Sequence, residues 1–355
     1  MDDAILALRS RIDAIDAEVL ALISERARCA HEIGHLKGGA AVYRPEREAQ
    51  VLRRLADLNT GPLPTADIQH VFVEIISACR ALERTMHIAF LGPRGTYSEE
   101  ASFKQFGTRI EPEPCASIAE VFHRVESGFA GYGVVPMENS TEGAIGTTLD
   151  LLLGTRLRIC AEVLLPIHHC LLSTESTLTS VATVYAHAQA LGQCNAWLSR
   201  HLPNAARVPV ASNAEAARRA RGEPTCAAIA SRGAGDVYGL GVLAENIEDE
   251  PDNTTRFVVI GDQDVGPSAR DKTTLVMGAA NRPGAMHELL GPFARHGVSM
   301  NRLESRPSRT ELWEYVFFVD IDGHQADPKV AQALTELRGQ AAFLKILGSY
   351  PVAPA

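Results

Sequence analysis

The N-terminal stretch has no glycine or proline before Gly34, and this absence of helix breakers predicts helical structure there. Apolar residues recur in it at alternating intervals of three and four positions, which is the spacing of one face of a long helix. They are Ile5, Leu8, Ile12, Ile15, Val19 and Leu22. Arg26 occupies the next position of this apolar face. Burying a guanidinium among apolar residues costs free energy unless an anion pairs with it or its aliphatic stem carries it to water. Both explanations of Arg26 stay open.

Two further helical segments follow, over about 45–58 and 67–84. Arg26 and Lys37 are eleven positions apart and share a face of the first helix, whereas Arg9 lies roughly 100° away around it. One helix cannot direct these three cations at one ligand, but two helices from different subunits can. Three helices of unequal length also form a poor monomeric core, so we expect an intertwined dimer.

From about residue 87 the pattern changes to short apolar strands alternating with polar loops and helices, which is typical of an α/β domain. A strand over 88–91 precedes Thr96, which can cap a helix with Glu99 as its capping-box partner. A strand over 133–137 precedes the polar loop 138–143 in the same way. Free amides at such helix starts attract carboxylates, so we expect these loops to bind an acid.

A third polar loop, 252–255, leads into a short buried strand that begins around Phe257. Thr254, Thr255 and Arg256 place two hydroxyls and a guanidinium at the mouth of that strand, beside the amide of Asn253. Such a group is suited to holding a small acid and moving a proton. An Asx turn followed by a strand-edge arginine is the alternative.

The segment 261–270 is rich in glycine, proline, serine and aspartate and is predicted to be a linker. Six elements follow it in the order strand, helix, strand, strand, helix, strand, over 273–279, 283–296, 298–305, 312–321, 328–337 and 343–347. This order predicts a small ferredoxin-like sheet with helices on one face. The region has no evident pair of nucleophile and base, which favours a binding or regulatory role.

Charge and cysteine usage exclude several classes of protein. The net charge is -9 without an extended block of lysine and arginine, which argues against a nucleic-acid partner. There is no signal-peptide core and no apolar run of about 18 residues, so we expect neither export nor a membrane span. The seven cysteines are scattered and never spaced C-x-x-C, which predicts reduced thiols in a cytoplasmic protein. We expect no metal site, and we interpret His168-His169 as a strand end.

Four segments of the middle third resemble the prephenate dehydratase signature. They are Gly92-Pro93-x-Gly95-Thr96-Tyr97-Ser98, Val135-Pro136-Met137-Glu138-Asn139-Ser140-x-Glu142-Gly143, His187-x-Gln189-Ala190-Leu191-x-Gln193-Cys194 and Thr255-Arg256-Phe257. The last third resembles a phenylalanine-sensing ACT domain through Pro283-Gly284-Ala285-Met286-His287 and Glu304-Ser305-Arg306-Pro307. The first third resembles the all-helical chorismate mutases. Along nearly its whole length the chain is thus similar to the bifunctional chorismate mutase/prephenate dehydratase family.

The resemblance implies a multidomain fold. Residues 1–85 are expected to form an all-α helical mutase domain, 86–262 an α/β dehydratase domain with two lobes like a periplasmic binding protein, and 271–355 an α+β ferredoxin-like ACT regulatory domain. The implied reactions convert chorismate to prephenate by a Claisen rearrangement, and prephenate to phenylpyruvate with loss of water and carbon dioxide, in L-phenylalanine biosynthesis. Neither reaction requires a cofactor. Phenylalanine is expected as a feedback inhibitor, and the protein is expected to be a homodimer or a larger oligomer.

The same resemblance implies roles in the mutase domain. Arg9 of the partner subunit, Arg26 and Arg47 would hold the two carboxylates of chorismate. Lys37 would donate a hydrogen bond to the ether oxygen, and Glu48 would bind the ring hydroxyl.

Two positions of the mutase domain differ from some relatives. Glu83 stands where some carry glutamine, facing the ether oxygen, and only a protonated carboxyl can donate a hydrogen bond there. We therefore expect mutase activity to rise as the pH falls. Cys79, which we expect to contact the substrate, stands where some relatives carry serine.

In the dehydratase domain the resemblance makes Thr255 the residue that assists the departing ring hydroxyl. The substrate carboxylates would be positioned by Arg256 and by the polar loops, through Thr96, Ser98, Asn139 and Ser140. In the ACT domain phenylalanine would lie at a subunit interface, surrounded by Asn281, Pro283, Gly284, Ala285, Met286, Glu304 and Ser305.

Two other functions are compatible with parts of this pattern. A monofunctional prephenate dehydratase could carry a helical N-terminus that serves only dimerisation, but the cations and Glu48 of the helical region argue against it. A non-catalytic solute-binding or amino-acid-sensing protein could use the same two-lobed and ferredoxin-like domains. The missing export signal and the hydroxyls of Thr254 and Thr255 argue against that alternative.

Overall fold

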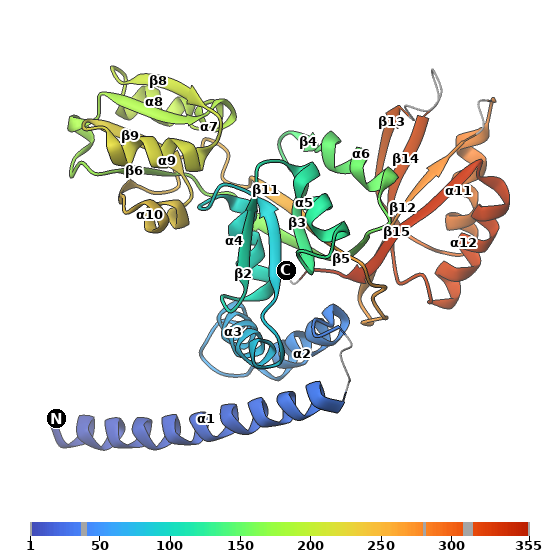
Figure 1. Cartoon of the computed structure of the whole chain (residues 1–355), viewed down its shortest axis with the longest axis horizontal. Helices are drawn as coiled ribbons and strands as arrows, with labels where there is room; N and C mark the ends of the chain where they lie inside the picture. Colours follow the sequence, from blue (N-terminus) through green and yellow to red (C-terminus); the bar gives the residue numbers. More distant parts are fainter. Residues whose placement is uncertain (1, 37–40, 280–281, 308–314, 354–355) are drawn as a thin grey trace.

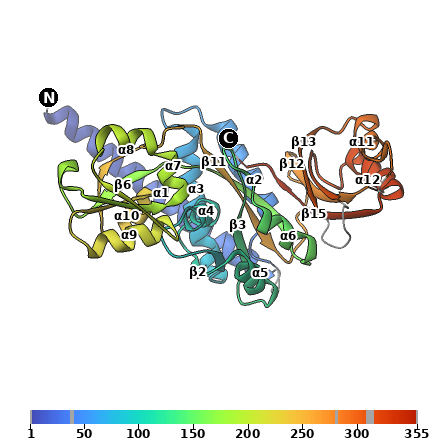
Figure 2. The same ribbon diagram turned by 90° about the horizontal axis from the view of Figure 1, so that it is seen from above.

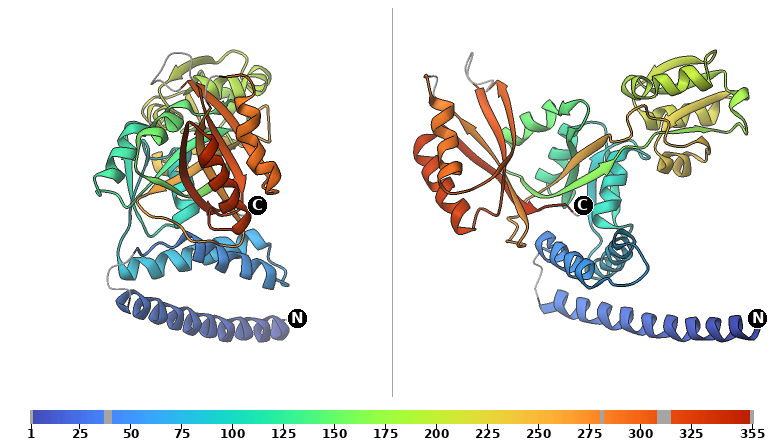
Figure 3. Two further views of the ribbon diagram at one scale, coloured as in Figure 1. Left: turned by 90° about the vertical axis from the view of Figure 1, so that its right-hand side faces the viewer. Right: turned by 180° about the vertical axis from the view of Figure 1, so that it is seen from behind.

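The computed structural model describes residues 2–36, 41–279, 282–307 and 315–353. Three parts follow each other along the chain, namely a group of helices, an α/β part in two lobes, and a small antiparallel sheet with two helices (Figure 1). This confirms the multidomain fold class. Figures 2 and 3 show the first lobe lying between the second lobe and the C-terminal sheet, with the N-terminal helices along one side. Within the described ranges, no helix has the length and apolarity needed to cross a membrane.

The N-terminal helices are α1 (Asp2–Leu36), α2 (Pro45–Leu58) and α3 (Thr65–Glu83). Tyr43, just before α2, is fully buried against aromatic rings of the first lobe, so α2 and α3 are anchored there. By contrast, α1 contains no buried residue, and its N-terminal half extends beyond the other helices in Figure 1. The apolar residues that predicted it are 43% to 70% exposed, namely Ile5, Leu8, Ile12, Ile15, Val19 and Leu22.

The first lobe is built on a mixed sheet with strand order β2-β1-β3-β11-β5 and the short β4 paired to β3. Its strands are β1 (His87–Leu91), β2 (Glu111–Cys115), β3 (Tyr132–Asn139), β4 (Gly143–Ala144), β5 (Arg158–Pro166) and β11 (Thr254–Gly261). β1 is parallel to β2 and β3, whereas β11 is antiparallel to β3 and β5. The lobe's helices are α4 (Tyr97–Phe106), α5 (Ile118–Glu126) and α6 (Gly146–Gly154).

The second lobe has the strand order β10-β6-β9-β7-β8. Its strands are β6 (Cys170–Ser173), β7 (Thr183–His187), β8 (Ala206–Val210), β9 (Cys226–Ala230) and β10 (Gly241–Ala244). Its helices are η1 (Leu178–Ser180), α7 (Ala188–Gln193), α8 (Asn195–His201), α9 (Asn213–Gly222) and α10 (Arg232–Tyr238). The chain enters this lobe after β5 and returns through β11, so β11 begins at the junction of the two lobes.

The C-terminal domain is an antiparallel sheet with strand order β13-β14-β12-β15. Its strands are β12 (Asp271–Gly278), β13 (Met300–Pro307), β14 (Tyr315–Asp322) and β15 (Phe343–Pro351), and its helices are α11 (Ala285–Arg295) and α12 (Pro328–Gln340). Both helices pack on one face of the sheet around a core that includes Leu275, Leu289 and Leu334. The predicted ferredoxin-like element order is therefore confirmed.

The other face of the C-terminal sheet packs directly on the first lobe. Val276 and Phe318 share one apolar core with Val135 and Ile159 of that lobe. At Gly348 the two backbones approach so closely that a Cβ atom would lie 2.2 Å from the carbonyl oxygen of Ile159. The first lobe and the C-terminal domain therefore share a tightly packed interface.

Candidate functional site

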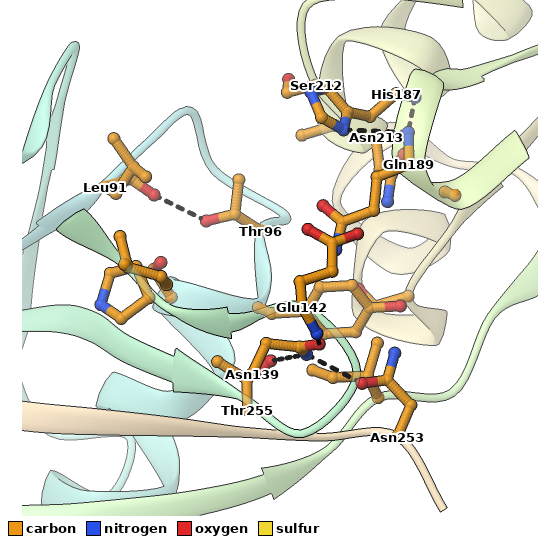
Figure 4. Close-up of a pocket in the computed structure, with 18 of the residues that line it drawn as sticks. Leu91, Thr96, Asn139, Glu142, His187, Gln189, Ser212, Asn213, Asn253 and Thr255 are labelled. Atoms are coloured by element: carbon orange, nitrogen blue, oxygen red, sulfur yellow. Dashed lines mark hydrogen bonds between the residues drawn. The ribbon is translucent and has the colours of Figure 1, made fainter. Parts of the chain in front are cut away.

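A cavity of about 390 Å³ lies between the two lobes, where β11 begins (Figure 4). The first lobe contributes the start of α4 and the loop after β3, and the second lobe contributes the starts of α7 and α9. Four of the residues predicted to bind prephenate line it, namely Thr96, Ser98, Asn139 and Thr255. Ser140 is outside the lining and accepts a hydrogen bond from the Thr254 amide (2.9 Å).

Thr255 is held by Asn139 on the neighbouring strand. The Asn139 Nδ2 atom donates hydrogen bonds to Thr255 Oγ1 (2.9 Å) and to Asn253 Oδ1 (2.8 Å), as Figure 4 shows. Asn139 Oδ1 in turn accepts from the amide (3.0 Å) and hydroxyl (2.6 Å) of Thr141. Since Thr255 Oγ1 is an acceptor in this network, its own O–H is left to donate, and no acceptor for it occurs among the described residues.

The start of α4 directs free amides at the cavity. Thr96 caps the helix, accepting from the Glu99 amide (3.4 Å) and donating to the Leu91 carbonyl (2.9 Å). The Glu99 carboxylate reaches back to the Gly95 amide (2.6 Å), which confirms the predicted cap with the reciprocal bond shifted by one residue. The next two amides, of Tyr97 and Ser98, have no partner in this first turn of the helix.

A hydrogen-bonded chain crosses from the first lobe to the second. The Tyr97 hydroxyl lies 2.9 Å from His169 Nδ1, and His169 Nε2 lies 2.9 Å from Gln193 Oε1. Burial lowers the pKa of His169, so its ring is neutral near pH 7. With Gln193 Oε1 facing the ring, the His169 proton is on Nε2, and the Tyr97 hydroxyl hydrogen is shared between His169 Nδ1 and the His168 carbonyl (2.8 Å). In this arrangement the Gln193 Nε2 is buried in the cavity wall and has no hydrogen-bond partner among the described residues.

Most of what the second lobe contributes does not follow from the sequence patterns. His169 is interpreted from the sequence as part of a strand end, and Ser212, Asn213 and Ser231, which also line the cavity, are not predicted from it. Ser212 caps α9 by accepting from the Glu215 amide (3.1 Å), so the pattern serine-x-x-glutamate after a strand was an available signal. Among the described lining residues there is no arginine or lysine.

Arg256 does not contribute to the cavity as predicted. Successive residues of a strand point to opposite faces, so Thr255 on the cavity side directs Arg256 to the other side. There its Nε lies 2.9 Å from Glu162, its Nη1 contacts Asp320, and its Nη2 donates to the Tyr350 hydroxyl (2.8 Å). Asp320 and Tyr350 belong to the C-terminal domain.

The N-terminal helices bring several predicted mutase residues together. Arg26 Nη1 lies 3.0 Å from Cys79 Sγ. Glu83 lies against Gly34, where a Cβ atom would be 2.7 Å from its carboxyl carbon. Glu48 is ion-paired with Arg80 (2.9 Å), and burial raises the pKa of its carboxyl.

Arg9 and Arg47 are not gathered in this way. Arg47 is exposed on α2, and Lys37 lies outside the described residues. Arg9 is exposed near the free end of α1, about 25 Å from Arg26 along the helix axis. The described chain therefore does not bring Arg9 to the group formed by Arg26, Glu48 and Glu83.

The residues predicted to surround phenylalanine form two groups. Pro283, Gly284, Ala285 and Met286 lie at the start of α11, and Asn281 lies outside the described residues. Glu304 and Ser305 lie on β13, an edge strand, and alternation places their side chains on opposite faces of the sheet. One ligand on one face of a single sheet would thus meet only one of these two side chains.

Family models match three consecutive parts of the chain. Residues 8–84 match type II chorismate mutase, residues 88–265 match prephenate dehydratase, and residues 273–339 match the ACT domain. Two curated relatives are named bifunctional chorismate mutase/prephenate dehydratase. The one from Neisseria gonorrhoeae is 52% identical over 99% of this chain and 98% of the relative. The one from Aquifex aeolicus is 42% identical over 98% and 97%.

Two solved structures are similar over about three quarters of the chain. A prephenate dehydratase from Arthrobacter aurescens in complex with L-Phe is 36% identical, with a TM-score of 0.69, and covers 75% of this chain and 90% of that one. A structure described as a novel type of quorum quenching acylase is 32% identical, with a TM-score of 0.70, and covers 76% of this chain and 98% of that one.

Proposed function

This chain belongs to the bifunctional chorismate mutase/prephenate dehydratase family, and we propose below which of its residues carry out the two reactions. It is an enzyme of aromatic amino acid biosynthesis that forms prephenate from chorismate and phenylpyruvate from prephenate, and it carries an ACT domain. The residue roles, the oligomeric state and the response to phenylalanine are the proposals.

The dehydratase reaction takes place in the cavity between the lobes. The bond between the ring and its carboxylate breaks, carbon dioxide leaves, and that electron pair completes the aromatic ring. The ring hydroxyl leaves from the opposite (para) ring carbon as water, after taking up one proton from the solvent. Thr255 donates its free O–H to this departing oxygen, supported by the hydrogen bond that it accepts from Asn139. A threonine hydroxyl is a weak acid, so Thr255 acts mainly by positioning, and aromatisation supplies the driving force.

Prephenate is held in the cavity by dipoles instead of by cationic side chains. The free amides of Tyr97 and Ser98 at the start of α4 bind one carboxylate. The buried Gln193 Nε2, oriented by His169, donates to the substrate from the second lobe. Because both amide hydrogens of Asn139 are used within the protein, its role is to hold Thr255 and not a carboxylate.

An acylase activity has less support in this cavity. Acyl transfer by serine or threonine needs a base in hydrogen-bond contact with the nucleophilic hydroxyl. The two histidines of the lining are engaged elsewhere, since His169 contacts Tyr97 and Gln193 and the His187 ring accepts from the Gln189 amide (3.4 Å). The similarity to the acylase structure therefore supports the fold of this part of the chain and not that activity.

The mutase reaction takes place between the N-terminal helices of two subunits. The apolar face of α1 is exposed along most of the helix, and an exposed apolar surface of this kind marks a contact with another protein surface. A second α1 covers it in a homodimer. The same contact brings Arg9 of the partner subunit to Arg26, Cys79 and Glu83. The two arginines then bind the carboxylates of chorismate, Lys37 and a protonated Glu83 donate to the ether oxygen, and Arg47 and Glu48 complete the site.

The ACT domain binds phenylalanine and lowers dehydratase activity. The similar dehydratase structure from Arthrobacter aurescens contains L-Phe, which supports this ligand. The residues at the start of α11 bind one part of the amino acid, and Ser305, which alternation places on the same face of the sheet as α11, binds another, whereas Glu304 faces the first lobe. β13 is an edge strand and can pair with the ACT domain of a second subunit, which would complete the site.

The observation that carries the dehydratase proposal is the Thr255 hydroxyl, held by Asn139 at the floor of the cavity with its proton free. We expect Thr255→Ala to lower the rate of phenylpyruvate formation from prephenate by roughly 10²- to 10⁴-fold. Thr254→Ala, which removes the neighbouring hydroxyl outside the cavity, is the matched control. It should keep the dehydratase rate, and both variants should keep mutase activity.

Two outcomes would contradict this assignment. Equal losses in Thr255→Ala and Thr254→Ala would show that the loop as a whole matters and not the hydroxyl. A loss of mutase activity in parallel with dehydratase activity would show misfolding or a wrong assignment of the two sites.

A further inference from the structure

Six charged side chains meet between the first lobe and the ACT domain, and we call them the interface ion cluster. The first lobe contributes Glu138, Glu162 and Arg256, and the ACT domain contributes Lys272, Arg302 and Asp320. Three cations face three anions, so the cluster is neutral. Arg256 contacts Glu162 and Asp320, Lys272 contacts Glu162 (2.8 Å), and Arg302 contacts Glu138 (3.0 Å). The side chains of Glu162 and Asp320 are 1% exposed.

The cluster lies on the opposite face of the sheet from Thr255 and Asn139. In the β3–β11 ladder Thr255 is opposite Asn139, and Arg256 is opposite Glu138. The first of these pairs faces the cavity and the second faces the ACT domain, because successive residues of a strand alternate. Only one residue step, about 3.3 Å, separates the two pairs along each strand.

On one side β11 pairs in regular register with β5 through Thr255 and Arg256, but on the other side its ladder with β3 is interrupted next to them. The register of β11 against β3 shifts between Arg256 and Phe257, immediately after the two pairs. At such an irregularity the regular hydrogen bonding is interrupted and the strand bends. On the β3 side the position of Thr255 therefore depends also on the side-chain contacts of Arg256 and Glu138, and the ACT domain supplies one partner for each, namely Asp320 and Arg302.

Part of the cluster is incompletely satisfied. Arg302 is 9% exposed, yet its Nη1 and Nη2 have no hydrogen-bond partner among the described residues. By contrast, Asp320, the partner of Arg256, also accepts a hydrogen bond from the Thr274 hydroxyl (2.7 Å). The carboxylate that holds Arg256 is therefore itself held in place. Arg302 shares β13 and its lobe-facing side with Glu304, two residues away. A displacement of β13 would therefore move Arg302 and, through Glu138, the loop that begins at Asn139.

We propose that Arg256 and Glu138 are positioning residues of the dehydratase, and that Asp320 and Arg302 of the ACT domain set the position of Thr255 through them. The ACT domain is then a structural part of the dehydratase site as well as a separate sensor. An effector that displaces β13 reaches Thr255 by this route. The proposal rests on the role proposed for Thr255 and adds the residues through which the ACT domain regulates it.

The test uses full-length protein and the variants Asp320→Asn and Glu138→Gln, which keep side-chain shape and remove one charge. Each should lower the dehydratase kcat roughly ten- to hundredfold, because small misplacements of a catalytic group have effects of this size. The KM for prephenate should change less than about twofold, since Thr255 acts on the bond that breaks. Mutase activity of the same samples reports correct folding.

Lys345→Met is the matched control. Lys345 belongs to the same interface and donates to the carbonyl oxygens of Leu152 (2.9 Å), Leu153 (2.8 Å) and Thr155 (2.6 Å) at the end of α6, away from the Thr255 pair. It should keep the dehydratase kcat within about twofold. A second control combines Glu138→Gln with Arg302→Gln, and the double variant should lose less than the product of the two single losses, because these residues contact each other.

Several results would overturn the proposal. These are a wild-type kcat in Asp320→Asn and Glu138→Gln, an increase in KM alone, or an equal loss in Lys345→Met. If Asp320→Asn also loses mutase activity, Glu138→Gln decides, since that side chain is 35% exposed and easier to replace. The proposed function and the positioning role fail in different ways. A wild-type protein without dehydratase activity would contradict the proposed function. An active wild-type protein whose kcat is unchanged by the substitutions would contradict the positioning role. Phenylalanine should inhibit Asp320→Asn less than it inhibits the wild type.

Discussion

The N-terminal helices and the cavity between the two lobes solve the same problem in different ways. Each must hold a dianion inside a protein of net charge -9. In the proposed mutase site the helices use cationic side chains such as Arg26, whereas the described lining of the cavity has no arginine or lysine and offers amides, hydroxyls and side-chain amides. Inside a helix the backbone groups are bonded to each other, so only side chains are available. A strand–loop–helix unit leaves free amides at the helix start, and these bind anions without a formal charge.

The two regions also differ in completeness. The cavity is formed by both lobes of one chain, and Thr255 is already held in place by Asn139. The helical site lacks Arg9, which lies near the far end of an uncovered α1. The comparison therefore predicts that mutase activity depends on assembly and on charge, and that dehydratase activity depends on local geometry.

The largest expected effect on the mutase is the loss of its activity when the half-buried Arg26 is removed. Arg26→Met should lower the mutase rate by roughly 10²- to 10³-fold, since one charged donor to the reacting group is lost. The dehydratase rate should stay within about twofold. Arg28→Met is the matched control, because Arg28 is exposed on the same helix and pairs only with Glu25 among the described residues. A similar loss in both variants would contradict a specific role for Arg26.

The next effect tests whether Arg9 comes from the partner subunit. Arg9→Ala and Arg26→Met chains, each inactive as a mutase, should form mixed dimers in which one of the two sites has both arginines. After random exchange of subunits, about one quarter of the wild-type mutase activity should return. Dehydratase activity is the internal control and should not change. If no activity returns although mixed dimers form, both arginines act within one chain or Arg9 has no role.

A smaller effect concerns pH. In its proposed role Glu83 can donate to the ether oxygen only as a carboxylic acid, so wild-type mutase activity should rise as the pH falls. Glu83→Gln donates at every pH, so its mutase profile should become flatter, with a gain of several-fold at the alkaline end. The dehydratase profile of the same protein should not move. An unchanged mutase profile would contradict the role of Glu83.

The smallest expected effect is that of salt. Exposed and half-buried charges are screened over about 8 Å at physiological ionic strength, whereas buried dipoles are screened less. Raising the ionic strength should therefore increase the KM for chorismate more than the KM for prephenate. The ratio of the first KM to the second should rise roughly two- to threefold. Equal changes in the two constants would weaken the contrast between a charge-based and a dipole-based site.

The sequence predicted the arrangement of the molecule better than the direction of individual side chains. The three fold types, the exposed apolar face of α1 and the cap at Thr96 follow from periodicity and local hydrogen bonding. Arg256 was placed in the cavity because it is next to Thr255 in the chain, although neighbours on a strand face opposite ways. The same rule separates Glu304 from Ser305. Once strands are predicted, their alternation indicates these side-chain directions.

Other residues of the site could not be found from local patterns. His169 and Gln193 meet Tyr97 only because the chain crosses between lobes and folds back. The interface ion cluster similarly joins β3, β5 and β11 of the first lobe to three strands of the ACT domain. Such contacts depend on the packing of domains, which periodicity within one segment does not specify.

The most direct test of two separate anion sites is to supply chorismate alone to an equal mixture of Thr255→Ala and Arg26→Met proteins, and to follow prephenate and phenylpyruvate. Thr255→Ala alone should accumulate prephenate, and Arg26→Met alone should leave chorismate unchanged. We predict that the mixture forms phenylpyruvate, because each variant retains the site that the other has lost. If both variants are folded and the mixture forms no phenylpyruvate, the two reactions do not use independent sites and the account is wrong.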